Sequence, residues 1–429
     1  MRRWPAYTAW ILTRALVLYW LIGPERTTTD GDLFYYQHSL DALHDNGIAQ
    51  TLNEYPIPAF ILLALPYLFL KLAHLTVIYP HLVATLALAT DFVYLRFLLH
   101  SRKWHPNQPT WLEITAAEWT WILAVAAFGA TTFARFDLIP GMLVGLAILY
   151  AVHRPNVAAV FGVLATGVKY WPAIVLPTLA APADTRGRAI KAGVIAGGAL
   201  GVVSLAVGGW ERLISPLQYQ GARGLQIESI FATPAMVHWA HDPHRYTVFY
   251  SSAKADEVSG PDVAWLLHLS SIATIVLAVV LVALWIGSWL RLRDPERSID
   301  VMVWLILASV SGFIVTSKVF SPQYLLWMLP GAAAGLVVLR GHRSWNRLAS
   351  WTMVLLAATL MTHEIYPRSY TALSVHTPES GAIVALLTMR NLMILGLCLY
   401  AVYESARGLV RLRPAAEASV EHDLGTVDA

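Results

Sequence analysis

The chain has 429 residues, of which 57% are hydrophobic and only 13% are charged, and its formal net charge is +3 at pH 7. Soluble domains usually carry about 25% charged residues, so this composition excludes a compact soluble globule and indicates a membrane protein. The small net charge and the absence of a basic stripe argue against nucleic-acid binding, and the single cysteine, Cys398, excludes an intramolecular disulfide and a cysteine-based metal site.

Apolar runs follow one another along most of the chain. A helix needs about 20 mainly apolar residues to cross ~30 Å of hydrocarbon. The first run follows Arg2 and Arg3 and has no small-residue cleavage site, which predicts a retained span rather than a signal peptide. We expect an all-α polytopic bundle of about 12 transmembrane helices over residues 1–411. The predicted spans are 7–23, 80–99, 114–132, 137–152, 155–169, 171–183, 189–209, 263–290, 299–317, 322–340, 347–363 and 382–404.

The apolar run 57–78 is the exception, because Pro56, Pro58, Pro66 and Lys71 interrupt it. We predict that it is re-entrant or lies in the interface. With the N-terminus in the cytoplasm, most of the 30 Lys and Arg then fall on the cytoplasmic side, whereas a full span at 57–78 would reverse this bias. This topology puts both termini in the cytoplasm and two long segments, 24–56 and 210–262, outside. The tail 412–429 is expected to be disordered.

Polar residues that a membrane bundle does not need gather in five segments, all predicted on the extracytoplasmic side. They offer carboxylates, cations and aromatic rings at a similar depth, as a site at the bilayer surface requires. The candidates are Asp30, Asp32, Tyr36 and Tyr55 in the first outer loop, Arg135 and Asp137 in the next, Lys169, Tyr170 and Trp171 in the third, Arg223, Gln226 and Glu228 in the large loop, and Lys318, Gln323 and Tyr324 in the last.

Each candidate also has a purely structural interpretation. Asp30 and Asp32 could simply be loop carboxylates, and Arg135 and Asp137 could form an ordinary surface ion pair. Lys169 and Lys318 could be cations that snorkel to the interface. The aromatic residues suit interface anchors, and the large-loop charges suit helix ends. Three further charges, Arg14, Asp91 and Arg390, fall inside spans, where a charge costs ~2.5–3.5 kcal/mol on insertion scales. We expect these three to pair within the bundle, with Asp91 opposite an arginine.

The five segments together resemble glycosyltransferase family 87 of the C-type (GT-C) superfamily, which is similar to the polyprenol-phosphate-mannose-dependent mannosyltransferases of actinobacterial envelopes. The resemblance covers about residues 8–340. It rests on Asp32-Leu33-Phe34-Tyr35-Tyr36, Ala134-Arg135-Phe136-Asp137, Lys169-Tyr170-Trp171-Pro172, Arg223-Gly224-Leu225-Gln226-Ile227-Glu228-Ser229 and Ser321-Pro322-Gln323-Tyr324. Tyr55-Pro56-Ile57-Pro58 departs from the family's Tyr-Pro-Pro stretch by one displaced proline.

The resemblance implies that Asp32, and not Asp30, is the catalytic carboxylate, because Leu33 and Tyr36 fix the register. The implied reaction moves a sugar, expected to be mannose, from a polyprenyl phosphate to an extracytoplasmic glycolipid, lipoglycan or polysaccharide. Asp32 acts as general base in an inverting single displacement. Four cations are expected to hold the donor phosphate, and the other candidates to bind substrate. These cations are Lys169, Lys318, Arg223 and Arg135.

This interpretation requires no cofactor, because cationic side chains neutralise a monophosphate leaving group. The spacing Asp30-x-Asp32 matches the metal-binding pattern of nucleotide-sugar enzymes, so dependence on a divalent metal stays open. The expected location is a bacterial plasma membrane. Three alternatives remain: an arabinofuranosyl transferase of the same superfamily, a lipid-linked sugar transporter or flippase, and a membrane scaffold. A transporter predicts charges near the bilayer midplane and related halves, whereas here the polar clusters lie at one surface.

Overall fold

The computed structural model describes residues 2–104, 110–221 and 223–412, with only the backbone at Asp32. Seven helical segments in these ranges are long and apolar enough to cross a membrane. Most of the predicted tail lies outside the described residues. The expected all-α polytopic membrane fold is confirmed. The long helices are α1 (Trp4–Ile22), α5 (Tyr79–Ser101), α11 (Ala183–Gly221), α13 (Val263–Arg291), α14 (Pro295–Thr316), α16 (Trp345–His363) and α18 (Ser380–Arg411).

Five shorter apolar helices complete the bundle. Each has 13–16 residues and is therefore about 20–24 Å long. They are α4 (Ile57–Leu72), α6 (Ala116–Phe128), α8 (Leu138–Tyr150), α9 (Pro155–Val168) and α15 (Leu325–Val338). The 18-residue core of α14 is 89% buried, whereas the corresponding parts of α11 and α13 are 6% and 17% buried. The bundle is thus centred on α14, α15 and α8, while α11 and α13 present apolar faces to the surroundings.

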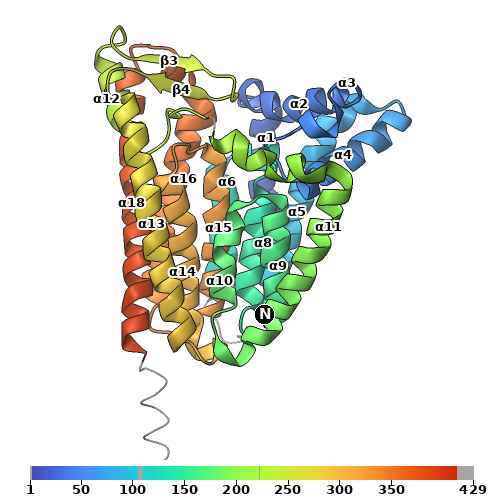
Figure 1. Ribbon diagram of the computed structural model, residues 1–429, viewed down its shortest axis with the longest axis vertical. Coiled ribbons are helices and arrows are strands. Elements are labelled where there is room, and N and C mark those ends of the chain that lie inside the picture. Colours follow the sequence, from blue (N-terminus) through green and yellow to red (C-terminus); the bar gives the residue numbers. More distant parts are fainter. Residues whose placement is uncertain (1, 105–109, 222, 413–429) are drawn as a thin grey trace, which may run out of the picture.

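The non-spanning elements gather at one end of the bundle, which we call the loop end. Figure 1 shows the N-terminus and the last turns of α18 at the opposite end. The loop end carries α2 (Arg26–Asp41), α3 (Leu43–Gln50), α12 (Thr233–His241) and the antiparallel strands β3 (Thr247–Tyr250) and β4 (Asp256–Ser259). Much of the two predicted outer segments is therefore regular structure. Smaller elements are η1 (Thr76–Ile78), β1 (Thr110–Trp111), β2 (Ile114–Thr115), α7 (Thr131–Ala134), η3 (Pro322–Tyr324), η4 (Glu364–Arg368) and α17 (Thr371–Ser374).

Prolines break one of the predicted apolar segments but leave another continuous. The predicted span 171–183 is not one helix but η2 (Trp171–Val175) followed by the single turn α10 (Leu176–Leu179). Pro172 and Pro177 lack the amide hydrogen that a continuous helix needs, which explains the break. By contrast, α4 runs through Pro66, and Figure 1 places it near α2 and α3 at the loop end.

Glycine and buried ion pairs fix the geometry of the bundle. Gly209 has a φ of +69°, which turns α11 so that its last twelve residues, 210–221, run across the loop end. Arg14 pairs with Asp91 at 2.7 Å, and both side chains are buried. This confirms the expectation that Asp91 faces an arginine. The third buried charge, Arg390, pairs with a carboxylate of the loop end instead, as described below.

Candidate active site

Two adjoining cavities lie at the loop end of the bundle. The first, which we call the apolar cavity, has a volume of about 580 Å³. It lies between the outward-facing helices α11 and α13, the buried helix α14 and the short segment η2. Its apolar walls suit a hydrocarbon chain. The residues that line it include Trp171, Ile174, Pro216, Leu217, Ser270, Thr274, Ile275, Phe313, Thr316 and Trp327.

The second cavity, which we call the polar cavity, has a volume of about 600 Å³. It lies between α2, the turned end of α11, the strand β4 and the segment before α15. Its lining combines four cations, two carboxylates and several tyrosines, which are side chains suited to hydroxyl-rich and anionic ligands. The cations are Arg135, Lys169, Arg223 and Lys254, and the carboxylates are Glu54 and Asp256.

The two cavities meet at four residues that line both of them. These are Glu54, Lys169, Gln220 and Tyr324, and we call their position the junction. A molecule with an apolar tail and a polar head can therefore occupy both cavities at once, with its head group on the polar side of Lys169.

Lys169 is fixed at the junction by a buried carboxylate. Its Nζ lies 2.6 Å from Oδ1 of Asp137, which also accepts a 2.8 Å hydrogen bond from the Trp327 indole. The Asp137 side chain is 1% exposed and the Lys169 side chain 18% exposed. The same Nζ lies 5.1–5.8 Å from the ring centres of Tyr55, Tyr324 and Trp327. The cation thus has a rigid aromatic surround and keeps one side open to the cavities.

Stacked aromatic rings form the wall behind Lys169. The Tyr324 and Trp327 ring centres are 3.8 Å apart, and Trp171 stacks on the other side of Trp327 at 4.9 Å. Tyr170 lines the apolar cavity and donates its hydroxyl to the Leu213 carbonyl at 2.6 Å. These rings serve both as packing and as the surface of the junction.

The other predicted phosphate ligands lie around Lys169 but on different cavities. Lys318 lines the apolar cavity and donates to the Gly221 carbonyl at 2.8 Å. Burial lowers the pKa of Lys318 below its usual value. Arg135 and Arg223 line the polar cavity, and the buried Nε of Arg223 has no hydrogen-bond partner among the described residues. The structure therefore brings all four predicted cations to the two cavities.

The two aspartates predicted in the first outer segment differ in their relation to the polar cavity. Asp32 lies on α2, whose residues Thr28, Gly31 and Tyr35 line the polar cavity, but its side chain is outside the described part of the structure. Asp30 lines neither cavity and forms an exposed 2.9 Å pair with Arg26 on the same helix.

Two buried tyrosines connect this segment to the rest of the site. The hydroxyl groups of Tyr36 and Tyr55 are 3.3 Å apart. Tyr55 also lines the polar cavity, and burial raises the pKa of its phenol well above the usual value. Gln323, from the segment before α15, lines the same cavity with a buried Oε1 that has no hydrogen-bond partner among the described residues.

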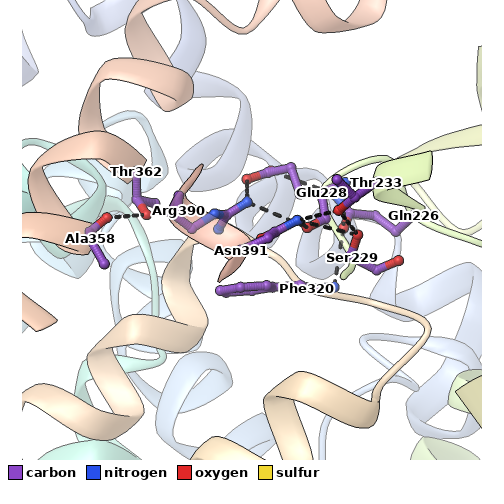
Figure 2. Close-up of polar contacts among 9 residues, drawn as sticks. All are labelled: Gln226, Glu228, Ser229, Thr233, Phe320, Ala358, Thr362, Arg390 and Asn391. Carbon is purple, nitrogen blue, oxygen red and sulfur yellow. Dashed lines mark hydrogen bonds and ion pairs between the residues drawn. The ribbon is translucent and has the colours of Figure 1, made fainter. Parts of the chain in front are cut away.

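Glu228 was expected to bind substrate, but it lines neither cavity and instead holds the large loop to α18. Figure 2 shows the Arg390 guanidinium directed at Glu228, with Nη2 3.1 Å from Oε2, and both side chains are fully buried. Asn391 donates to the carbonyl oxygens of Glu228 and Ser229 at 3.2 and 3.4 Å. Burial raises the pKa of Glu228 to about 7, although the positive charge of Arg390 opposes the shift.

Gln226 transmits this anchoring to the cavity wall. Its Oε1 accepts hydrogen bonds from the backbone of Glu228 at 3.2 Å and of Phe320 at 3.1 Å (Figure 2). The backbone N–H of Gln226 donates to the Lys318 carbonyl at 3.0 Å. The loop that carries Arg223 and the segment that carries Lys318 are therefore joined to each other and, through Glu228, to the last helix.

Sequence reasoning missed several residues that line the polar cavity. The most central is Glu54, which directly precedes the selected Tyr55-Pro56. Asp256 lies at the start of β4, and burial raises the pKa of its carboxyl. Lys254 lies with its Nζ 4.0 Å from the ring centre of Tyr35. Nothing local in the sequence distinguishes these charges from those of other loops. The remaining tyrosines of the cavity are Tyr219, Tyr250, Tyr366 and Tyr370.

The helical bundle and its paired cavities define a polytopic membrane protein with a charged site at one end of its membrane-embedded helices. The family model of glycosyltransferase family 87 matches residues 53–322, which is more than half of the chain, and the chain belongs to this family. It is therefore a membrane glycosyltransferase. The match contains Glu54, Arg135, Lys169, Arg223 and Lys318 but begins after α2, so Asp32 precedes it. Comparisons with curated proteins and with solved structures gave no match.

Proposed function

We propose that this glycosyltransferase moves a sugar, expected to be mannose, from a polyprenyl phosphate to a glycolipid or polysaccharide acceptor. One observation carries the proposal: an apolar and a polar cavity of similar volume meet at Lys169. A polyprenyl chain fits the chemistry of the first cavity and a glycosyl group that of the second. The phosphate that links them then lies at the junction, where a cation is needed.

The cations have a definite part in this reaction. As the bond between the anomeric carbon and the phosphate oxygen breaks, negative charge develops on the phosphate. Lys169 at the junction, Lys318 on the apolar side and Arg135 and Arg223 on the polar side neutralise this charge through charge-assisted hydrogen bonds. Lys169 and Lys318 are already held by Asp137 and by the Gly221 carbonyl, so these two cations require little reorganisation.

Asp32 is proposed as the general base. Two observations support this. Thr28, Gly31 and Tyr35, on either side of Asp32 in α2, line the polar cavity. Asp32 also begins the Asp-Leu-x-x-Tyr motif of the family. The acceptor hydroxyl loses its proton to the carboxylate as its oxygen attacks the anomeric carbon, and polyprenyl phosphate leaves from the opposite face. A single displacement inverts the anomeric configuration.

The orientation belongs to the same proposal. We place the loop end on the extracytoplasmic face of a bacterial plasma membrane and both termini in the cytoplasm, which agrees with the distribution of Lys and Arg. Cysteine labelling at the exposed Glu211 position, in a C398S background, tests this orientation from outside the cell.

The decisive experiment is transfer by purified protein in liposomes with synthetic polyprenyl-phosphate mannose, glucose or arabinofuranose, analysed by mass spectrometry. We expect a mannosylated acceptor and a loss of turnover of about 10²–10⁴-fold in Asp32→Asn, the range typical of a general base. Transfer only from the arabinofuranosyl donor would assign the sugar differently. Movement of the labelled donor between leaflets without a new glycosidic bond would instead identify a flippase.

A further inference from the structure

A carboxylate lines the junction together with the cation. Among the described side chains, Glu54 is the only carboxylate that lines both cavities, and Lys169 is the only cation that does so. Glu54 is half-buried, and no basic side chain among the described residues forms an ion pair with it. A carboxylate beside a bound phosphate is electrostatically unfavourable, because like charges repel. Its presence at the junction therefore indicates a function of its own.

The side chain of Glu54 is held by a tyrosine. The Tyr35 hydroxyl donates a hydrogen bond to Oε1 of Glu54. Burial, and next the charge of Glu54, raise the pKa of the Tyr35 phenol above its usual value, so Tyr35 stays a donor at physiological pH. One carboxylate oxygen is thereby fixed, and the group faces the cavities from a defined position.

The backbone next to Glu54 is held by a buried arginine. Arg212 is 0% exposed, and its guanidinium donates to the carbonyl oxygens of Ile48, Thr51, Leu52 and Asn53 at 2.6–3.3 Å. Within the part of the chain that the structure describes, no carboxylate forms an ion pair with it. Burying an ion costs several kcal/mol, and here the hydrogen bonds to backbone carbonyls offset much of that cost.

The arginine owes its position to the turn in α11. Gly209 redirects the helix across the loop end, and Arg212 follows three residues later. Ser215, one turn further, adds a 2.8 Å hydrogen bond to the Asn53 carbonyl and accepts one from Arg212 at the same distance. The segment 48–53 is thus clamped at several consecutive carbonyls immediately before Glu54, which is the arrangement expected of a preorganised site.

We propose that Glu54 is a second catalytic carboxylate, which contacts the donor sugar beside the phosphate held by Lys169, and that Arg212 is a positioning residue that keeps Glu54 there. This inference rests on the proposed function. When the bond from the anomeric carbon to the phosphate oxygen breaks, its electron pair leaves with polyprenyl phosphate. Positive charge then develops on the anomeric carbon and the ring oxygen until the acceptor oxygen completes the new bond.

The two junction charges stabilise the two halves of that transition state. Lys169 faces the leaving phosphate, and ionised Glu54 faces the electron-poor sugar ring. The acceptor's proton goes to Asp32, so Glu54 neither gains nor loses a proton and forms no covalent bond. A glutamine at position 54 keeps the hydrogen-bonding shape but not the charge, and therefore separates electrostatic stabilisation from simple sugar binding.

The first test compares Glu54→Gln with wild type in the liposome transfer assay. We expect kcat to fall on the order of 100-fold, the loss typical of removing one electrostatic contact to a transition state, while KM for the donor changes less than about threefold. Thermal unfolding should be unchanged. Glu211→Gln is the matched control, because Glu211 is an exposed carboxylate of the same region that lines neither cavity.

The second test separates positioning from a merely structural role. Arg212→Met should lower kcat strongly in the wild-type background but by less than about twofold in Glu54→Gln, because the residue acts through Glu54. A similar loss in both backgrounds would refute the positioning role. A Glu54→Gln enzyme with kcat within twofold of wild type would overturn the whole inference and leave the proposed function standing. If wild type itself transfers no sugar from any polyprenyl phosphate, the proposed function fails and this inference fails with it.

Discussion

Replacing Lys169 with methionine removes the junction cation and leaves Asp137 as a buried, uncompensated carboxylate. Its Oδ1 then keeps only the 2.8 Å hydrogen bond from Trp327, and its buried Oδ2 has no partner among the described residues. Breaking a buried ion pair from one side costs about 3–5 kcal/mol. Since the Lys169 side chain is 18% exposed, we reduce this to about 2–3 kcal/mol of unfolding free energy.

The double variant Lys169→Met with Asp137→Asn separates stability from catalysis. Removing both charges leaves a neutral amide, so we expect unfolding free energy to return to within about 1 kcal/mol of wild type. Transfer should nevertheless stay at least about 100-fold below wild type, because the donor phosphate still lacks its cation. The single variant Asp137→Asn keeps the cation and should retain most of its activity.

Both quantities are measurable on the same purified samples. Thermal unfolding in detergent gives the order of stability of the four proteins, and the liposome assay gives their transfer rates. If the double variant regains both the stability and the transfer rate of wild type, Lys169 only neutralises Asp137, and the reasoning that places the phosphate at the junction is wrong.

Three further outcomes follow from contacts outside the junction. Lys318→Ala should lower kcat/KM for the donor in the transfer assay, but by less than Lys169→Met does, because Lys318 lines only the apolar cavity and not the junction. Burial raises the pKa of Glu228 to about 7, so between about pH 4.5 and 7 the folded state binds a proton that the unfolded state has lost. The unfolding free energy of wild type should therefore fall as pH rises through this range. Glu228→Gln should lack this pH dependence. Arg14→Met should lower unfolding free energy by about 3–5 kcal/mol, since Asp91 is 0% exposed; an unchanged melting temperature would contradict this.

The membrane fold was predictable because lipid leaves a chain few choices. Backbone amides in hydrocarbon must bond within the segment, so each long apolar run becomes a helix. The run 171–183 shows the limit of this rule. Its apolar composition predicts a span, but Pro172 and Pro177 remove two amide donors and the segment becomes a 3-10 helix and one α-turn. Composition determines that the segment is buried, and the prolines determine its form.

The site was predictable only in part, because the side chains that pair in it come from helices far apart in the sequence. The motifs placed Arg135, Lys169 and Arg223 at one end, and the structure gathers them around two cavities. The sequence could not indicate that Glu228 faces Arg390 rather than a substrate, since the pairing depends on how α12 and α18 pack. Glu54 carried no local signal either. Its backbone is held in place by Arg212, which reaches the carbonyls before Glu54 because α11 turns at Gly209.

The anchoring of the large loop by α18 has a consequence for how the protein is made. Glu228 and Arg390 are 162 positions apart, and membrane helices are inserted in the order in which they are synthesised. The wall that carries Arg223, Gln226 and Lys318 therefore waits, with a carboxylate unpaired, until α18 is in the bilayer. Insertion of α18 is the step that closes this wall of the two cavities.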